Sequence, residues 1–167
     1  MDNADNLIEK ARALQNLLSS QQTLLMSTVS DSCVPNMSYA PFVRDQSGCF
    51  YIFISDLADH TSNLRANKQA SAMIVRPEAE SRNLFARERA IFTCTVRELQ
   101  PHGAFYQDRL NALEEKFGEV VGLLRSLSDF HLFVLSPERG RYVAGFGQAY
   151  LINVNDGSVS PLNKKHG

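Results

Sequence analysis

The chain lacks the sequence patterns that mark several large classes of enzyme. No GxSxG, HExxH, Walker A or CxxC motif occurs in its 167 residues, which removes the usual signatures of serine hydrolases, zinc peptidases, P-loop NTPases and thioredoxin-like proteins. The three cysteines, Cys33, Cys49 and Cys94, are far apart. An odd number without a close pair argues against a disulfide framework or a zinc cluster. The simplest interpretation is reduced thiols in a cytoplasmic protein.

Excess charge of one sign and long apolar runs are also missing. The net charge is −1, so neither nucleic acid nor an anionic membrane is expected as a partner. An anionic ligand would have to be met by local basic residues. No apolar run approaches the roughly 18 residues that a membrane span needs. The acidic, polar start at 1–6 does not have the basic region of a signal peptide.

The residues that are present have the composition of one ordinary globular domain, 44% hydrophobic and 21% charged. Apolar residues at helical spacing predict an N-terminal helix within 1–20. Residues 21–154 are expected to form a barrel with helices, and 155–167 a polar tail. The expected strands are 23–29, 36–43, 49–54, 70–75, 87–99, 130–135, 141–144 and 148–154, the expected helices are 59–67, 103–117 and 119–127, and the expected turns are 45–48 and 137–140.

The order of these elements predicts the fold class. Several antiparallel strands at short spacing, interrupted by a few helices, indicate a mainly β protein with flanking helices, built as a small closed or split antiparallel β-barrel. A parallel α/β sheet is disfavoured, because helices do not alternate regularly with strands and no Gly-rich phosphate loop follows a strand.

Asp129 and His131 open the strand expected at 130–135 and share one face of it with Phe133 and Leu135. The Asp129 carboxylate has two interpretations. It is a solvated strand end or helix cap, or it accepts a hydrogen bond from a histidine Nδ1–H and so orients that ring toward a metal. His131 is either that histidine or an ordinary core residue.

The remaining candidates are basic or imidazole side chains. Arg87 and Arg89 either form a solvated strand end, or one of them points into a pocket to bind an anion or a metal-bound oxygen. A capping or surface role is favoured for His60. His166, beside Lys164 and Lys165, is a candidate ligand if the tail docks and has no meaning if it does not, since chain ends are usually loose.

These positions resemble a known family. The run Asp59-His60-Thr61-Ser62-Asn63-Leu64-Arg65-Ala66-Asn67, ahead of an Ala/Met/Ile/Val strand, resembles the pyridoxamine-phosphate-oxidase-like split barrels, whose members often bind FMN. Segments 109–118, 128–133 and 145–149, the last with the sequence GFGQA, narrow the resemblance to the HugZ/HutZ-type haem-utilisation proteins of Gram-negative bacteria. The likeness extends from about Leu14 to His166.

That resemblance implies a homodimer of split barrels that binds haem near the dimer interface. It implies that haem is degraded with O2 and reducing equivalents through verdohaem to a biliverdin-type product, with release of iron. The electron donor and the haem-delivery protein are not identified by the sequence. Matched residue by residue, His166 corresponds to the iron ligand, Asp129 to the proximal carboxylate, and Arg89 of the Arg87/Arg89 pair to the distal arginine. His60 matches a histidine near the haem pocket, and Lys164 and Lys165 are candidate partners for the haem propionates.

Two other functions accompany this expectation. The first is an FMN-dependent oxidoreductase, because many split barrels bind FMN at the dimer interface. It would leave His166 and Asp129 without a purpose. The second is a haem store or carrier that binds haem without turning it over.

Overall fold

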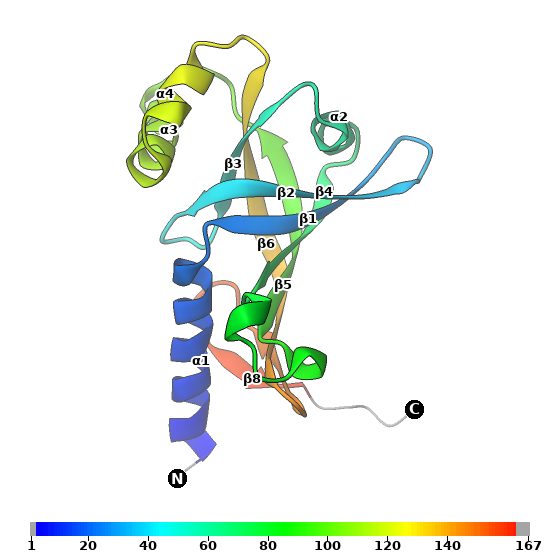
Figure 1. The fold of residues 1–167 in the computed structure, drawn as a ribbon, viewed down its shortest axis with the longest axis vertical. Coiled ribbons are helices and arrows are strands. Elements are labelled where there is room, and N and C mark those ends of the chain that lie inside the picture. The colour runs from blue at the N-terminus through cyan, green and yellow to red at the C-terminus, as the bar shows by residue number, and fades with distance from the viewer. Residues whose placement is uncertain (1–2, 163–167) are drawn as a thin grey trace.

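The computed structural model describes residues 3–162, which form eight strands, four α-helices and two 3-10 helices (Figure 1). No helix in this range is long and apolar enough to cross a membrane. The strands are β1 (Thr23–Val29), β2 (Pro35–Arg44), β3 (Phe50–Ser55), β4 (Gln69–Val75), β5 (Arg89–Glu98), β6 (Phe130–Gly145), β7 (Gln148–Ile152) and β8 (Val159–Pro161). The helices are α1 (Asn3–Ser20), α2 (Asp59–Ala66), η1 (Glu78–Glu80), η2 (Leu84–Ala86), α3 (Ala104–Phe117) and α4 (Glu119–Arg125).

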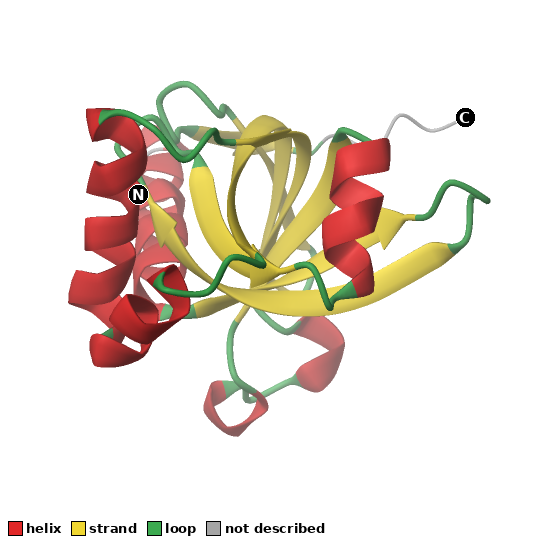
Figure 2. Cartoon of the chain, turned by 90° about the horizontal axis from the view of Figure 1, so that it is seen from above, coloured by secondary structure: helices red, strands yellow, loops and turns green. Residues whose placement is uncertain are grey.

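Six of the strands described between residues 3 and 162 close a barrel. Their order is β3-β2-β1-β4-β5-β6, and a further pairing of β3 with β6 joins the two ends. Every neighbouring pair is antiparallel. Seen from above, the strands curve around a common centre (Figure 2). The antiparallel split barrel with flanking helices that the sequence predicts is therefore confirmed.

β6 corrects one sequence-based expectation. The predicted turn at 137–140 is wrong, because β6 is a single strand of 16 residues. Its pairing with β3 ends at Leu135, and its pairing with β7 begins at Gly140. Pro137 therefore lies where the strand has no neighbour on that side, and its missing N–H removes no ladder hydrogen bond there. A bulge in the β5–β6 ladder at the same level takes up one extra residue.

The segment 155–167, expected as a tail, contains part of the sheet. β8 lies within it and pairs antiparallel with β7, with Ile152 opposite Val159. Val159 is buried in the inner core and β8 contacts α1. A strand of three residues that ends in a proline has too short a pattern to be recognised in the sequence.

Alternating side chains on the barrel strands supply two cores. On β6, Phe133 and Leu135 point into the barrel, while Leu132 and Val134 pack on the outside beneath α3 and α4. This alternation agrees with the faces predicted from the sequence. The inner core holds most of the large buried side chains, among them Phe42 and Phe50, whose rings meet edge to face at 5.5 Å.

The barrel is closed by different side chains beside α1 and beside α2. In the lower part of Figure 1, α1 packs Leu14, Leu17 and Leu18 onto the inner core, and none of them is more than 3% exposed. In the upper part, beside α2, Glu98 comes after the buried Val96 on the inward face of β5, and His131 comes before the buried Phe133 on that of β6. The barrel thus has an apolar closure at α1 and a polar one at α2.

Candidate functional site

Asp129 lies at the α2 end of the barrel, just before β6. Its backbone carbonyl accepts a hydrogen bond from the Asp56 N–H at 2.8 Å, and its Oδ2 accepts one from Ser55 Oγ at 2.7 Å. The side chain is half-buried, and within residues 3–162 its Oδ1 has no hydrogen-bond partner. The carboxylate is thus positioned by the β3–α2 connection and keeps one oxygen to accept a further donor.

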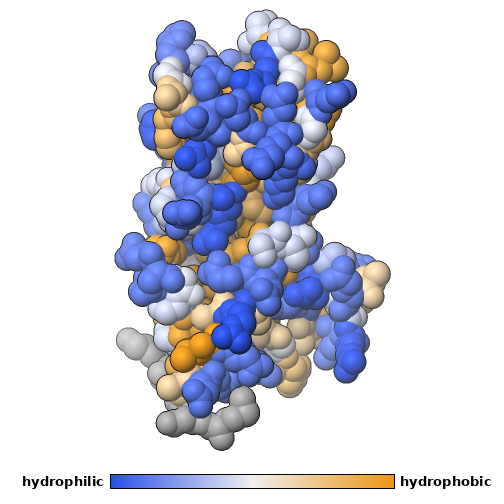
Figure 3. Space-filling view, turned by 90° about the vertical axis from the view of Figure 1, so that its left-hand side faces the viewer, coloured by the Kyte–Doolittle hydropathy of each residue, from blue (hydrophilic) through white to orange (hydrophobic). Residues whose placement is uncertain are grey.

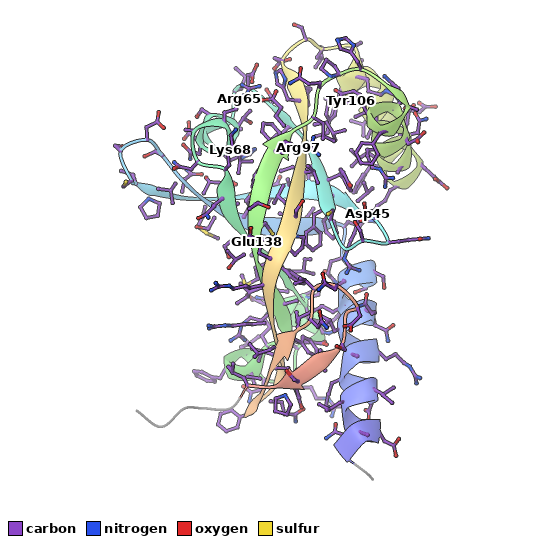
Figure 4. All side chains as sticks on the ribbon, turned by 180° about the vertical axis from the view of Figure 1, so that it is seen from behind. Asp45, Arg65, Lys68, Arg97, Tyr106 and Glu138 are labelled. Atoms are coloured by element: carbon purple, nitrogen blue, oxygen red, sulfur yellow. The ribbon has the colours of Figure 1, made fainter. Side chains whose placement is uncertain are left out.

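His131 is not the partner of Asp129. Its Nε2 lies 2.9 Å from Asp56 Oδ2 and its Nδ1 lies 3.0 Å from Glu98 Oε1. Arg65 contacts the same two carboxylates, with Nη1 at 2.6 Å from Asp56 and Nε at 2.7 Å from Glu98. We refer to Asp56, Arg65, Glu98 and His131 as the mouth cluster. Figure 4 shows Arg65 beside α2 at this end of the barrel.

The mouth cluster is internally satisfied. The hydrogen bonds from Arg65 hold the pKa of both carboxyl groups, Asp56 and Glu98, below their ordinary values, and the bond to Glu98 raises the pKa of the Arg65 guanidinium. Because Arg65 is engaged by both carboxylates and His131 contacts each of them, the cluster joins α2 to β5 and β6 without leaving a strong donor for a ligand. Its members lie far apart in the sequence, which is why sequence reasoning did not find it.

His60 occupies the first turn of α2, and it does not cap that helix. The N-cap position is Ala58, and no side chain caps the helix there. Of the two roles favoured for His60, capping or surface, the capping role is therefore wrong. The His60 ring is half-buried, and its Nε2 is shielded from solvent with no hydrogen-bond partner among the described residues. Burial lowers the pKa of this imidazole, so the ring is neutral near pH 7.

Arg89 lies on β5, beside the end of β6 that is farthest from Asp129. It opens β5 and is paired with Val75 on β4 and Val143 on β6. Its Nη1 donates to the carbonyl of Arg87 at 2.8 Å, and no carboxylate of residues 3–162 lies within 4.0 Å of the guanidinium. Arg87, in contrast, donates to the carbonyl of Arg76 and pairs with Glu78 at 3.2 Å. Of the two arginines, Arg89 keeps more free N–H donors.

Exposed aromatic side chains gather at the Arg89 end. The Phe146-Gly147 turn joins β6 to β7 with Gly147 at φ +71°, which a glycine adopts without strain. A bulge in the β6–β7 ladder lies just before this turn, between Val143 and Gly145. Phe146 is 82% exposed, and Phe85 on η2 is 95% exposed. A shallow cavity of about 240 Å³ between the two segments is lined by Arg76, Arg87 and Phe146.

Asp129 and Arg89 are thus not brought together within one chain. Asp129 precedes the first residue of β6, and Arg89 is opposite Val143 near its last. Along an extended strand the two positions are about 40–50 Å apart. A haem is much shorter than this and cannot contact both side chains of one protomer. Three further predicted residues, Lys164, Lys165 and His166, lie outside the described residues.

The outward faces of four barrel strands form an apolar row. In direct register, Tyr39 on β2 is opposite Leu25 on β1, Leu25 is opposite Met73 on β4, and Met73 is opposite Ile91 on β5. Tyr39 is 65% exposed, and Met37 beside it is 63% exposed. Contiguous apolar patches of this kind on a protein surface usually mark an interaction surface. In the described part of the chain, no group of three His, Cys, Asp or Glu side chains could hold a metal ion.

The fold and the positions of these residues define the class of protein. Its antiparallel split barrel is that of the pyridoxamine 5′-phosphate oxidases, and the family model described as Pyridoxamine 5′-phosphate oxidase matches residues 11–144. The chain therefore belongs to this family, and within it to the HutZ-type group. It is 40% identical over 136 residues to the haem oxygenase HutZ of Vibrio cholerae, a match that covers 81% of this chain and 77% of that protein.

Solved structures agree with this assignment. The crystal structure of HutZ from Vibrio cholerae, described there as a haem storage protein, has a TM-score of 0.73 and 35% identity, covering 76% of this chain and 89% of that one. ChuZ of Campylobacter jejuni has a TM-score of 0.82 and 28% identity, covering 98% of this chain and 64% of that one. A haem-binding protein from Mycobacterium smegmatis, at 24% identity and a TM-score of 0.74, shares the fold.

Proposed function

We propose that this protein binds haem as its substrate between two copies of the chain and opens it oxidatively, with O2 and a reductant, to a biliverdin-type product and free iron. The observation that carries the proposal is the 40% identity to a haem oxygenase over 81% of the chain. The unpaired oxygen of Asp129 and the free donors of Arg89 support it, because these are the groups that the two sides of a haem pocket require.

The proximal side of the site is assigned to Asp129, His60 and the tail. Asp129 Oδ1 would accept a hydrogen bond from the imidazole N–H of His166, the proposed iron ligand, from the other copy of the chain, because Leu162 is bonded to Ala149 at the Arg89 end of its own barrel. Such a bond would fix the ring orientation and increase its donation to the metal. His60, which is neutral, lies at the same end of the barrel and contributes to the pocket wall. Lys164 and Lys165 are proposed to pair with the propionates.

The distal side is assigned to Arg89. A guanidinium stays protonated at every working pH and offers several N–H donors in a fixed plane. It can therefore hold an oxygen species by hydrogen bonds without exchanging a proton with it. Phe146 and Phe85 give the apolar surface against which a porphyrin face packs.

A second copy of the chain completes the site. Asp129 and Arg89 are nearly the length of β6 apart, so one haem meets both only if they come from different protomers. The apolar row of Tyr39, Leu25, Met73 and Ile91, with Met37, provides a surface that a partner can cover. This arrangement supports a homodimer with two haem sites.

Haem titration tests the binding site. His166→Ala is expected to lose the histidine-ligated absorption spectrum, while His102→Ala, which changes an exposed loop residue, keeps it. An unchanged spectrum in His166→Ala would refute the ligand assignment.

In aerobic turnover with ascorbate and catalase, Arg89→Gln is expected to reduce the rate of product formation about tenfold or more. Arg87→Gln is the matched control and should keep most of the activity.

Mixing two inactive variants tests the two-copy site. In a heterodimer of Asp129→Ala and Arg89→Ala subunits, one site loses both groups and the other keeps both. Random mixing after co-refolding is therefore expected to restore about a quarter of the wild-type activity. If the mixture is as inactive as its components, Asp129 and Arg89 do not act across protomers.

Haem storage is the second candidate, because the Vibrio cholerae crystal structure is described as that of a haem storage protein. Haem bands that persist in air with reductant and catalase, without a biliverdin-type product, would favour storage over degradation.

FMN binding is the third candidate, and the family model supports it. Protein purified with stoichiometric FMN and no affinity for haem would establish it in place of the haem proposal.

A further inference from the structure

A cleft of about 600 Å³ lies between the C-terminal half of α1, the end of β2 and α3. Neither Asp129 nor Arg89 lines it. Figure 3 looks onto this side of the molecule, where apolar atoms are visible between the polar surfaces of α1 below and α3 and α4 above. The cleft has the size of a typical small-molecule site. Its apolar wall is formed by Leu18, Phe42, Val43 and Ala112.

Arg44, a positively charged residue, lines this cleft and also reaches Gly48 and the neighbouring cleft. Its Nη1 donates to Gln15 Oε1 at 3.1 Å, while its Nε is buried with no hydrogen-bond partner within residues 3–162. The guanidinium carbon lies 5.9 Å from the centre of the Phe50 ring. No carboxylate among the described residues lies within 4.0 Å of this guanidinium. The charge is thus partly removed from water without an ionic partner.

The nearest carboxylate along the chain is engaged elsewhere. Asp45, labelled in Figure 4, accepts hydrogen bonds from Ser47 Oγ at 2.7 Å and from Tyr51 Oη at 2.8 Å. The backbone N–H of Cys49 also donates to it, and Arg109 lies 4.0 Å away. Asp45 therefore does not neutralise Arg44 directly.

Lys116 contributes a second cation from the opposite wall. Its Nζ donates to the carbonyl of Phe42 at 2.9 Å and to that of Gln21 at 3.4 Å, and it lies 4.6 Å from the centre of the Phe42 ring. Within the described residues this ammonium also has no carboxylate within 4.0 Å. Burial lowers the pKa of Lys116 and that of Arg44. An anion placed between the two groups would favour the charged form of both.

We propose that this cleft binds a small apolar carboxylate, whose head contacts Arg44 and Lys116 and whose body packs on Leu18, Phe42 and Val43. A guanidinium and an ammonium without acidic partners recognise an anionic head, and the apolar wall recognises a hydrocarbon or aromatic body. Glu115 lines the cleft and is exposed at its rim. It repels a second negative charge, so the site selects a monoanion over a dianion.

Amide chemical shifts of the ¹⁵N-labelled full chain, recorded without haem, test this site with three probes. Octanoate has the head and the body, octanol has the body alone, and inorganic phosphate has charge alone. Octanoate is expected to shift cleft residues such as Gln15 and Ser19 saturably. Octanol and phosphate are each expected to bind about tenfold more weakly or worse. Equal affinity for octanol would overturn the role of the cations, and equal affinity for phosphate would overturn the role of the wall.

Substitutions of cleft residues test whether octanoate binds in this cleft. Arg44→Gln combined with Lys116→Gln is expected to weaken octanoate binding about tenfold or more, and Lys68→Gln, an exposed lysine on the α2–β4 connection, is the matched control. If the double variant does not fold, Ala112→Phe, which fills the cleft and keeps both charges, is expected to abolish the shifts. Octanoate binding that survives Ala112→Phe unchanged would place the ligand elsewhere and refute the proposal. Haem affinity enters none of these measurements, so the outcome is independent of the proposed enzymatic function.

Discussion

The α1 end and the α2 end of the barrel are closed by opposite chemistry. Beside α1, Leu14, Leu17 and Leu18 are almost fully removed from water. Beside α2, the side chains of the mouth cluster are between 27% and 42% exposed and interact through charge. Apolar burial involves no titrating group and is not screened by salt, whereas partly exposed ion pairs are weakened by salt and depend on pH. The contribution of the α2 end, which carries Asp129 and His60, to the free energy of unfolding is therefore expected to change with pH and salt. The contribution of the α1 end is expected to stay nearly constant.

The largest decrease in the free energy of unfolding is expected from Leu17→Ala at the apolar α1 end of the barrel. Removing this side chain, which is 0% exposed, leaves a cavity and should lower the free energy of unfolding by about 2–5 kcal/mol. The control is Ile8→Ala on the exposed face of the same helix, 60% exposed, with an expected change below about 0.5 kcal/mol. Urea unfolding measures both. Similar losses for the two variants would mean that α1 does not dock through its leucine face.

A smaller decrease in the free energy of unfolding is expected from Arg65→Met in the mouth cluster, at the α2 end of the barrel. The substitution leaves Asp56 and Glu98 without their shared cation, but the Arg65 side chain is 38% exposed and solvent screens the loss. We expect a decrease of about 1 kcal/mol in the free energy of unfolding. Arg97→Met, on the outward face of β5 and labelled in Figure 4, should cost less than about 0.5 kcal/mol. A larger loss for Arg97→Met would show that the mouth cluster contributes nothing specific.

The smallest effect is expected in the pH dependence of stability. The pKa values of Asp56 and Glu98 are lower in the folded chain than their ordinary values of 3.8 and 4.5. Their contribution to stability is therefore present above about pH 4.5 and is lost as the pH falls through the folded-state pKa values. The free energy of unfolding should decline below about pH 4.5 more steeply in wild type than in Arg65→Met.

Leu17→Ala serves as the control for that measurement, because it leaves the mouth cluster intact. Its curve should run parallel to that of wild type, displaced downward by a constant amount. If Arg65→Met and wild type have the same slope, the acid sensitivity arises outside the mouth cluster.

The sequence predicts features that depend on local pattern. Alternation along β6 places Phe133 and Leu135 inside the barrel, as expected, and the split barrel follows from the spacing of the strands. Pro137 was misread because a proline and a nearby glycine usually end a strand. Only the three-dimensional pairing reveals that β6 continues through Pro137 alongside β5, with no neighbour on its other edge there.

The candidate site was less predictable, because its properties depend on contacts between distant segments. The assignment of Arg89 rather than Arg87 to the distal side stays a prediction, and the engagement of Arg87 by Arg76 and Glu78, which leaves Arg89 with more free donors, has no sequence signature. The mouth cluster draws its members from four different segments, and no spacing rule connects them. Capping was one of the two roles favoured for His60, because a polar residue beside a helix start is often a cap, but the backbone places Ala58 at the N-cap position.

The pairing of β3 with β6 also has a kinetic consequence. Phe50 is opposite Leu135, so most of the chain must be in place before the barrel can close. The hairpins β1–β2 and β4–β5 form from neighbouring segments, but β3 keeps an unpaired edge until β6 arrives. Such long-range closure is slow, because the entropy of a large loop is lost before its contacts form. During synthesis, β3 is therefore the segment most exposed to pairing with a strand of another chain.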